Sequence, residues 1–433
     1  MDGLTIMRVR MGIAVLFLLG CVSNASASAT LLLEEPYGHL GAFTQTGHAA
    51  VYFDRVCAET PTVLRRCADG ETGAVISRYD KVGGYDWLAI PLVPYLYAVQ
   101  NPGDVPLFAD PKLVAFLRDQ YRRKNLEAIV PDGKNGSIPE GNWTQLIGSA
   151  YDRTIYGFQI QTSEAQDNNL IREYNARANT PHFNLIFHNC ADFARGVINF
   201  YYPRAMHRSL VTDAGITTPK QLARLMVRLG KRNPELEPTS FLIPQVPGSI
   251  PRSTPVHGVL ESVVKSKKYM AAIVVLHPIL AACLLAGDLG VDRFDPAKRA
   301  MVLASGPELQ PPLASSQRRS YQDQLNLLEQ DSQVNIAHEE KTWESLQSEA
   351  EPELDAEGRP MLKVHVGNDS VDMGIARDNV LTSSAPSALT EKLLTARLRE
   401  ELKRGSAPKA SETEIDSDWE LLQQVLPEQS KLQ

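Results

Sequence analysis

The chain has 433 residues, of which 43% are hydrophobic, and a formal net charge of −7. This length and composition suit one large globular domain or two ordinary ones. The acidic balance argues against nucleic acid as the main partner, because phosphate binding needs a basic face.

The first 29 residues have the pattern of a secretory signal peptide. Two arginines precede a short apolar run, which ends in a stretch of small residues with Ala-x-Ala motifs. The run is too short to cross a bilayer comfortably. We therefore expect export, with cleavage near Ala27 or Ala29. The segment Leu-Leu-Gly-Cys21 also resembles a bacterial lipobox, in which Cys21 would be lipidated, and both interpretations stay open.

Export changes how the remaining cysteines are interpreted. Cys57 and Cys67 flank a polar loop, which suits a disulfide bond across a hairpin in an oxidising compartment, with two unpaired thiols as the alternative. Cys283 falls in an apolar run and is expected to be a small buried side chain. Cys190 has no obvious partner. Since the sequence has no Cys-x-x-Cys pair or dense Cys/His cluster, we expect no structural zinc and no cofactor.

Residues 30–230 are predicted to form one compact α+β domain. The expected strands, taken from alternating or continuous apolar residues, are Gly47–Phe53, Gly73–Tyr79, Thr154–Thr162 and Phe183–Phe187. The expected helices, taken from capping residues followed by apolar positions at helical spacing, start at Asp110-Pro111, Ser163, Asn189-Cys190 and Thr218-Pro219.

The next two segments are expected to join this domain to the rest of the chain. Residues 231–264 are rich in Pro, Ser and charge and are predicted to be a linker. Residues 265–290 contain the apolar run 269–287, which reaches the lower limit for a transmembrane helix. Basic residues at its outer end run against the positive-inside tendency. A membrane span and a buried or surface-lying helix therefore remain alternatives.

The last segment, residues 291–433, is predicted to be an acidic and mostly mobile tail. It is rich in Glu, Gln, Ser and Asp and has few aromatic residues. Within it, Gln324–Glu351 and Leu389–Arg404 are candidate solvated helices, and Leu362–Val366 is a candidate strand.

Cys190 lies at the start of a predicted helix. Asn189 is a natural N-cap, and the apolar positions that follow recur at helical spacing. A sulfur at a helix N-terminus is stabilised as the thiolate by the helix dipole, and the free backbone N–H groups there can bind the oxyanion of acyl transfer. Asp192 in the first turn opposes the thiolate, so activation depends on a nearby histidine. An unreactive buried cysteine is the alternative.

The segment Asn189-Cys-Ala-Asp-Phe193 resembles the Asn-Cys-Glu-His-Phe segment of the lecithin:retinol acyltransferase group. That group belongs to the circularly permuted branch of the NlpC-type, papain-like cysteine hydrolases, in which a histidine strand precedes the nucleophile. Gly47-His-Ala-Ala-Val-Tyr-Phe53 looks like that strand. The resemblance implies an antiparallel sheet with a nucleophile helix, and Cys190 as nucleophile with His48 as base. It also implies a third polar residue on the next strand, for which Ser77 is the nearest positional match.

The sequence departs from the family in two ways. Ala191-Asp192 stand where the acyltransferase group has Glu-His, and the interval between the two motifs is longer. Rival bases are His39, which lies close to His48 in the sequence, and His188, which is close to the nucleophile but is expected to point away along its strand.

These observations predict an exported cysteine hydrolase of the periplasm or cell envelope, an amidase or endopeptidase acting on cell-wall peptide. The first alternative is a lipid-directed acyltransferase or phospholipase, which the apolar run 269–287 would help by holding the domain near a bilayer. The second is a non-catalytic envelope scaffold with the same fold. The expected partner is a peptide or lipid substrate, and no nucleic acid.

Overall fold

The structure is a computed structural model, and the residues it describes fall into several segments. They are 27–38, 45–106, 109–181, 183–246, 249–279, 281–282, 284–285, 294–298, 300–303, 315–332, 350–366 and 369–374, with Thr395, Leu398, Trp419, Leu422 and Gln423. Contacts divide the chain into two units. The first comprises Met1–Ala98, Arg118–Gln245 and Pro251–Pro307, and the second comprises Val99–Leu117, Val246–Ile250 and Glu308–Gln433.

The first unit is built on a seven-stranded sheet with the order β6-β5-β2-β1-β7-β8-β9. Neighbouring strands are antiparallel except β8 and β9, which are parallel. The strands are β1 (Ala27–Glu34), β2 (His48–Phe53), β5 (Ala74–Ser77), β6 (Leu88–Pro91), β7 (Ile155–Thr162), β8 (Thr239–Ile243) and β9 (Met301–Val302). The predicted α+β class with an antiparallel sheet is therefore confirmed.

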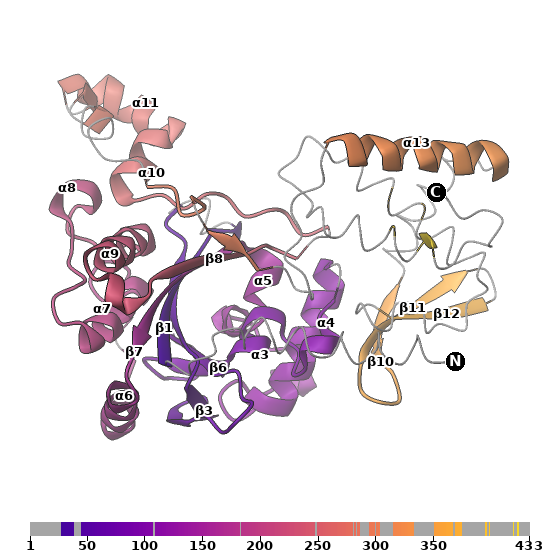
Figure 1. The fold of residues 1–433 in the computed structure, drawn as a ribbon, viewed down its shortest axis with the longest axis horizontal. Helices are drawn as coiled ribbons and strands as arrows, with labels where there is room; N and C mark the ends of the chain where they lie inside the picture. Colours follow the sequence, from indigo (N-terminus) through magenta and orange to yellow (C-terminus); the bar gives the residue numbers. More distant parts are fainter. Residues whose placement is uncertain are drawn as a thin grey trace. The chain divides into compact units, whose positions relative to one another are not determined.

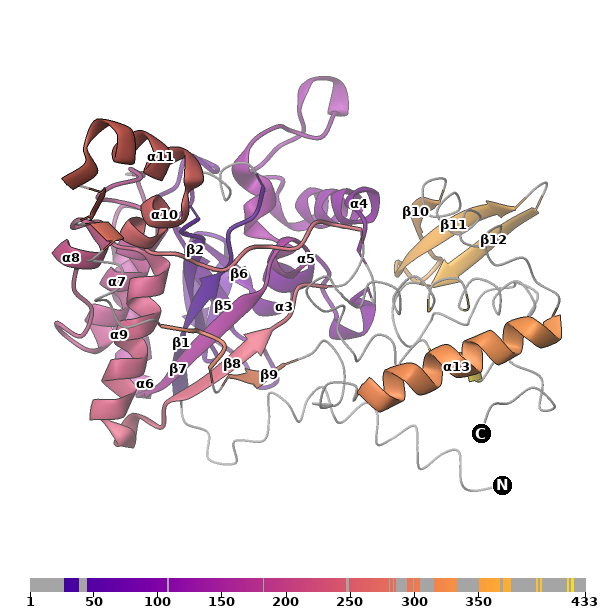
Figure 2. The same ribbon diagram turned by 90° about the horizontal axis from the view of Figure 1, so that it is seen from above.

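Helices cover both faces of this sheet, with α7 and α9 on one side and α3 and α5 on the other (Figure 1, Figure 2). The helices of this unit are α3 (Leu92–Tyr97), α5 (Ser149–Asp152), α6 (Glu164–Ala176), α7 (Cys190–Tyr201), α8 (Leu210–Asp213), α9 (Pro219–Arg232), α10 (Val259–Lys265) and α11 (Lys267–Leu276). Single-turn helices lie at η2 (Arg122–Leu126), η3 (Lys134–Gly136), η4 (Asn142–Leu146) and η5 (Pro234–Leu236).

Alternation along the strands explains why both faces are covered. In β1, Leu31 and Leu33 belong to the core that α7 and α9 complete, and the intervening Leu32 is equally buried. From α7, Val197 and Ile198 enter that core and are fully buried. A strand that is apolar on both faces needs a cover on each side, because apolar surface left in water costs about 25 cal/mol per Å². The sheet therefore forms the middle layer of this unit.

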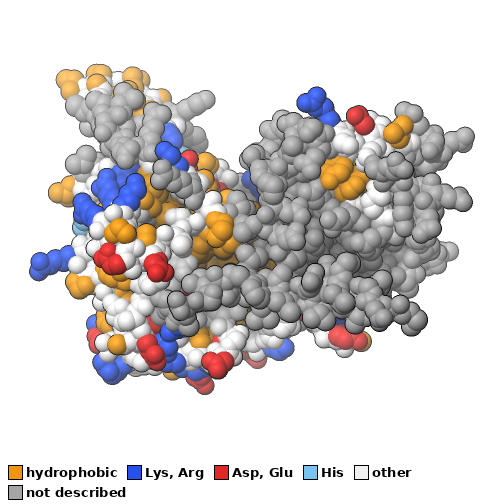
Figure 3. Space-filling view, viewed as in Figure 1, with side chains coloured by type: hydrophobic (Ala, Val, Ile, Leu, Met, Phe, Trp, Pro, Cys, Tyr) orange, Lys and Arg blue, Asp and Glu red, His pale blue; other side chains and the backbone are white. Residues whose placement is uncertain are grey.

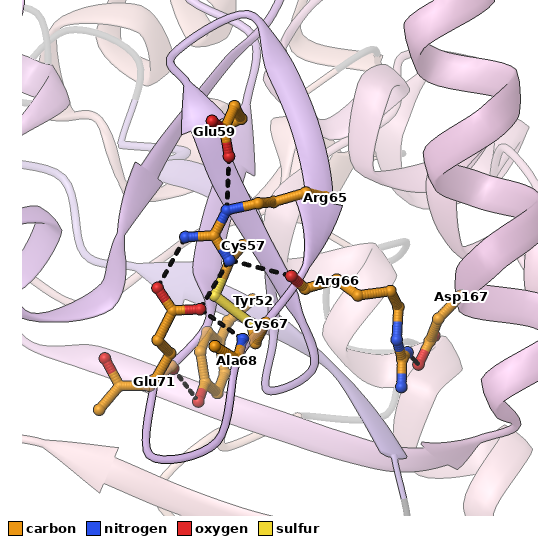
Figure 4. The surroundings of a disulfide bond; sticks show 10 residues. Tyr52, Cys57, Glu59, Arg65, Arg66, Cys67, Ala68, Glu71 and Asp167 are labelled. Carbon is orange, nitrogen blue, oxygen red and sulfur yellow. Dashed lines mark hydrogen bonds and ion pairs between the residues drawn. A yellow bond between two sulfur atoms is a disulfide. The ribbon is translucent and has the colours of Figure 1, made fainter.

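A cross-linked hairpin lies beside the sheet. Its strands β3 (Val56–Thr60) and β4 (Val63–Arg66) are antiparallel, and Cys57 and Cys67 form a disulfide bond with a Cα–Cα distance of 4.9 Å. The predicted disulfide is confirmed. Figure 4 shows Arg65 between Glu59 and Glu71, at 2.6 Å from each carboxylate. Since exposed ion pairs contribute about 0–1 kcal/mol, the disulfide is the main constraint on this hairpin.

The predicted domain limits differ from the observed ones. The described part of the chain starts at Ala27, the first residue of β1, so the sheet begins three residues before the expected domain. The last three residues of the predicted signal peptide, Ala27–Ala29, belong to β1, and the rest of that predicted segment lies outside the described residues. At the other end, the predicted linker 231–264 contains β8 and α10. Pro238 and Pro244 flank β8 and give the segment a loop-like composition, although its core pairs with β7.

The predicted apolar helix 265–290 is interrupted. The first helix in it, α11, ends at Leu276 with His277 as its C-cap, because the residue before a proline is disfavoured in the helical region and Pro278 has no N–H to donate. The side chains of Val275, Leu276 and Ile279 are exposed, so this part of the run is not a buried helix. No helix found in the described residues combines the length and the apolar character needed to cross a bilayer. Cys283 lies outside the described residues.

The second unit contains described elements within the segment predicted to be a mostly mobile tail. They are α13 (Ser315–Ser332) and the antiparallel strands β10 (Glu351–Leu354), β11 (Pro360–Val366) and β12 (Asp369–Gly374). The strand predicted over Leu362–Val366 is confirmed as part of β11, whereas Glu351, predicted to end a helix, begins β10. Most of Leu389–Arg404 lies outside the described residues. The unit also includes η1 (Pro102–Asp104) and the start of α4 (Pro111–Tyr121), where Asp110 caps the helix as predicted.

Candidate active site

The first turn of α7 places Cys190 at a helix N-terminus, as predicted. Asn189 has an extended conformation, and its side-chain oxygen accepts a hydrogen bond from the backbone N–H of Asp192 at 2.9 Å. The amide nitrogen of Asn189 donates to the carbonyls of Leu185 and Thr217. Asn189 is therefore fixed on both sides, and this fixes the position of Cys190, which is half-buried.

The segment before Cys190 is a tight hairpin, and the strand predicted over Phe183–Phe187 is wrong. Asn184 and His188 pair through their backbones, and the side-chain oxygen of Asn184 accepts hydrogen bonds from the N–H groups of Ile186 and Phe187. An asparagine side chain that binds the backbone two residues later competes with strand pairing. As a result Leu185, Ile186 and Phe187 are exposed by 70%, 47% and 53%. We call Asn184–His188 the apolar hairpin.

His48 is the first residue of β2, and hydrogen bonds fix its tautomer. The hydroxyl of Ser77, on β5, donates to the carbonyl of Ala49 at 2.8 Å and lies 2.9 Å from Nε2 of His48. Since the single hydroxyl proton points to Ala49, the serine oxygen accepts from Nε2–H. Nδ1 of His48 is thereby left to act as the base. Ser77, the positional match for the third polar residue, lies on the strand next to β2 and contacts the histidine directly.

The structure brings the side chains of His48 and Cys190 close enough for each to shift the pKa of the other. Burial lowers the pKa of His48, but the charge of a Cys190 thiolate and the hydrogen bond to it raise that pKa above its usual value. For Cys190, burial raises the pKa, whereas the His48 charge, the His48 hydrogen bond and a hydrogen bond from the backbone of Ala49 together bring it below the usual value. Shifts in these directions favour a thiolate beside an imidazolium.

Asp192 does not leave an uncompensated negative charge beside the sulfur. Its Oδ1 accepts a hydrogen bond from the hydroxyl of Thr217 at 2.6 Å and from Arg208 at 2.9 Å. Arg195 lies 3.2 Å from the same oxygen. Two guanidinium groups thus face one carboxylate, and the opposition to the thiolate that the sequence suggested is offset.

The other histidines in the described residues lie elsewhere. His188 is exposed at the base of the apolar hairpin, and its described contact is the backbone pairing with Asn184. His277 is the exposed C-cap of α11, and His257 hydrogen-bonds Gln45 and Lys265. The rival base His39 lies outside the described residues.

Sequence reasoning missed a group of buried residues behind His48. Glu34, at the end of β1, stands opposite His48 in the strand register and is fully buried. The ring of Tyr79 stacks on the imidazole, with 5.3 Å between centroids and 24° between planes. A glutamate that ends an otherwise apolar strand was the available signal for Glu34, because such a carboxylate is buried only with partners.

One group of potential metal ligands occurs in the described residues, at Cys57, Cys67 and Glu71, where the ligand atoms lie within 4.8 Å of one another. The two sulfurs are bonded to each other, and the Glu71 carboxylate is bound by Arg65 (Figure 4). Disulfide sulfurs are not thiolates, and thiolates are the form that binds metal. This group does not fit a metal ion.

Comparisons with models of protein families, with curated proteins and with solved structures found no match in any of the three.

Proposed function

We propose that this chain is a cysteine hydrolase with a circularly permuted papain-like domain, in which Cys190 is the nucleophile and His48 the base. The observation that carries the proposal is the pairing of His48 at the start of β2 with Cys190 at the start of α7, in which the pKa of Cys190 is lowered and that of His48 is raised. The order of the site in the sequence, with the histidine strand before the nucleophile helix, agrees with the resemblance to the lecithin:retinol acyltransferase group.

The reaction follows from the positions of these groups. The Cys190 thiolate attacks the carbonyl carbon of an amide or ester, and the carbonyl electrons move to oxygen. The first backbone N–H groups of α7 have no partner within the helix; since that of Asp192 is bound by the Asn189 side chain, those of Cys190 and Ala191 can bind this oxyanion. His48 gives its Nδ1 proton to the leaving amine or alkoxide, which produces a thioester. It then takes a proton from the water that attacks the thioester, which releases the acid and restores the thiolate.

We propose export to the cell envelope, with cell-wall peptide as substrate. The Cys57–Cys67 disulfide supports this location, because such bonds persist mainly in oxidising compartments. A lipid-directed acyltransferase or phospholipase is the second candidate. It is favoured by the apolar hairpin, which exposes three large hydrophobic side chains directly before Cys190, since contiguous exposed apolar residues are typical of protein or membrane contact.

Alkylation of Cys190 by iodoacetamide tests the nucleophile without knowledge of the substrate. The reaction is measured in the full chain at pH 6, by mass spectrometry of the peptide that contains Cys190. We expect Cys190 to react at least about tenfold faster than glutathione, because a larger fraction of Cys190 is thiolate at this pH. His48→Ala should remove most of this excess, and Cys190→Ser defines the background. A rate equal to that of glutathione, unchanged by His48→Ala, would indicate a non-catalytic scaffold.

Hydrolysis then separates the two substrate classes. Release of peptides from purified cell wall supports the amidase, and release of fatty acid from phospholipid vesicles supports the lipid-directed enzyme. With either substrate, activity should rise as Cys190 ionises, at a pH below the usual pKa of a thiol. It should fall as His48 loses its proton, at a pH above the usual pKa of an imidazole.

A further inference from the structure

Glu34 is a buried carboxylate to which the proposed reaction assigns no role. It ends β1, it is 0% exposed, and the strand register sets it directly opposite His48. Burial of an unpaired carboxylate costs several kcal/mol, so such a residue persists only where partners hold it.

The partners of Glu34 come from two other elements. The hydroxyl of Tyr95, on α3, donates to Oε1, and Nη1 of Arg153 lies 3.2 Å from Oε2. Tyr95 is 0% exposed and Arg153 is 4% exposed. The guanidinium of Arg153 in turn lies over the ring of Tyr37, 4.3 Å from its centroid. Glu34 is therefore held from both sides in a region closed to solvent.

This group is connected to the imidazole. The Tyr79 ring stacks on His48. Tyr79 also lies close enough to Glu34 and Tyr95 for both to act on the pKa of its hydroxyl. Tyr79 therefore lies between the Glu34 group and His48. The face of an aromatic ring attracts a cation, so Tyr79 also favours the protonated form of the ring beneath it.

Stability gives no reason to keep such a group. Replacing a buried ion pair by apolar residues of similar volume is often neutral or stabilising. A buried carboxylate opposite a histidine nevertheless has one definite effect, which is to favour a positive charge on the imidazole.

We propose that Glu34, held in place by Tyr95 and Arg153, is a positioning residue that keeps His48 in its imidazolium form beside the Cys190 sulfur. The inference rests on the proposed function, because the imidazolium matters only if its proton is given to a leaving group. Four other groups face His48 from the surrounding elements: Ser77, Tyr79, Cys190 and, with opposite sign to Glu34, Arg153.

The sign of the effect is the same at both residues of the pair. The Glu34 charge raises the pKa of His48 and also raises the pKa of Cys190. Its removal therefore lowers both pKa values, and the unpaired charge of Arg153 acts in the same direction. Both limbs of the pH–activity profile should move to lower pH, which a general loss of stability would not produce.

The test compares Glu34→Gln with Glu35→Gln in the full chain. Glu35 is the adjacent buried carboxylate, but it is bound by Ser253 and Tyr156. The two measurements are the pH dependence of Cys190 alkylation by iodoacetamide and of p-nitrophenyl acetate hydrolysis. For Glu34→Gln, we expect alkylation on the acid limb to be about threefold to tenfold faster and hydrolysis on the alkaline limb to be slower by a similar factor. Glu35→Gln should keep both limbs in place.

Two further variants cover the case in which Glu34→Gln does not fold because Arg153 is left unpaired. Glu34→Gln/Arg153→Met removes both charges, and Tyr95→Phe removes only the hydroxyl. Tyr95→Phe should move both limbs in the same direction by a smaller amount. The double variant also removes the opposite and smaller effect of Arg153 on His48, so its alkaline limb should move in the same direction by less than that of Glu34→Gln. Unmoved limbs in folded Glu34→Gln, or in both substitute variants where Glu34→Gln does not fold, would overturn the inference while leaving the proposed function intact. Ordinary thiol reactivity of Cys190 in the unmodified chain would instead overturn the proposed function.

Discussion

The two sides of the candidate active site are built differently. On the histidine side, three strands of one sheet hold His48, and its neighbours Glu34 and Ser77 are fully buried. On the cysteine side, Cys190 is half-buried at a helix start, and the residues just before it are exposed. A base held by a sheet needs no rearrangement before it acts, whereas a nucleophile must be reached by its substrate. Changes on the histidine side should therefore affect proton transfer as well as the thiolate that His48 stabilises, whereas changes on the cysteine side should affect mainly the thiolate and its surroundings.

The largest effect that would sharpen this comparison is expected from Ser77→Ala. The variant removes the oxygen that accepts from Nε2–H of His48, so neither the ring orientation nor the tautomer is fixed. We expect p-nitrophenyl acetate hydrolysis to fall by about tenfold to hundredfold, a part of the contribution of a general base. The matched control is Ser28→Ala, because Ser28 is also a buried serine, near the start of β1, and its hydroxyl binds Asp54 away from His48. An equal loss in both variants would mean that the serine acts only on stability.

A smaller effect is expected on the cysteine side from Arg208→Met. This change removes one of the two guanidinium groups that face Asp192, so the carboxylate acts more strongly against the nearby thiolate. The pKa of Cys190 should rise, and alkylation at pH 6 should slow by about threefold. Arg228→Met, at an exposed position on α9, is the control. If Arg208→Met alkylates as fast as the control, Asp192 has no influence on the sulfur.

The same division explains what the sequence could predict. His48 begins a strand and Cys190 begins a helix, and both elements follow from short local patterns: apolar and aromatic residues in β2, and a cap followed by a helical apolar stripe in α7. The burial of Glu34 could be suspected from the apolar run that it ends, but its place opposite His48 could not be predicted, because that place depends on the register between β1 and β2, which local patterns do not specify. The contact between Ser77 and His48 likewise depends on a long-range pairing, here between β2 and β5.

The apolar hairpin shows the opposite failure. Leu185, Ile186 and Phe187 have the composition of a buried strand, yet the Asn184 side chain takes up the backbone N–H groups that a strand would pair, and the three side chains remain in solvent. For a related reason, β8 was not predicted from the sequence. Its flanking prolines are typical of a loop, and the pairing with β7 that makes it a strand exists only in the folded sheet. Composition therefore misled wherever one side chain or one distant strand decided the backbone.

The smallest effect is expected from Asn189→Ala, which removes the cap of α7. Loss of an asparagine cap costs about 1 kcal/mol, which lowers the Tm of a domain of this size by about 2–4 °C. Ser163→Ala removes the cap of α6, which is part of a capping box away from the site, and should cost a similar amount. The two variants should differ in Cys190 alkylation, because Asn189 also ties α7 to the carbonyls of Leu185 and Thr217. Slower alkylation in Asn189→Ala alone would show that the cap holds the nucleophile in position, whereas equal rates would limit its role to helix stability.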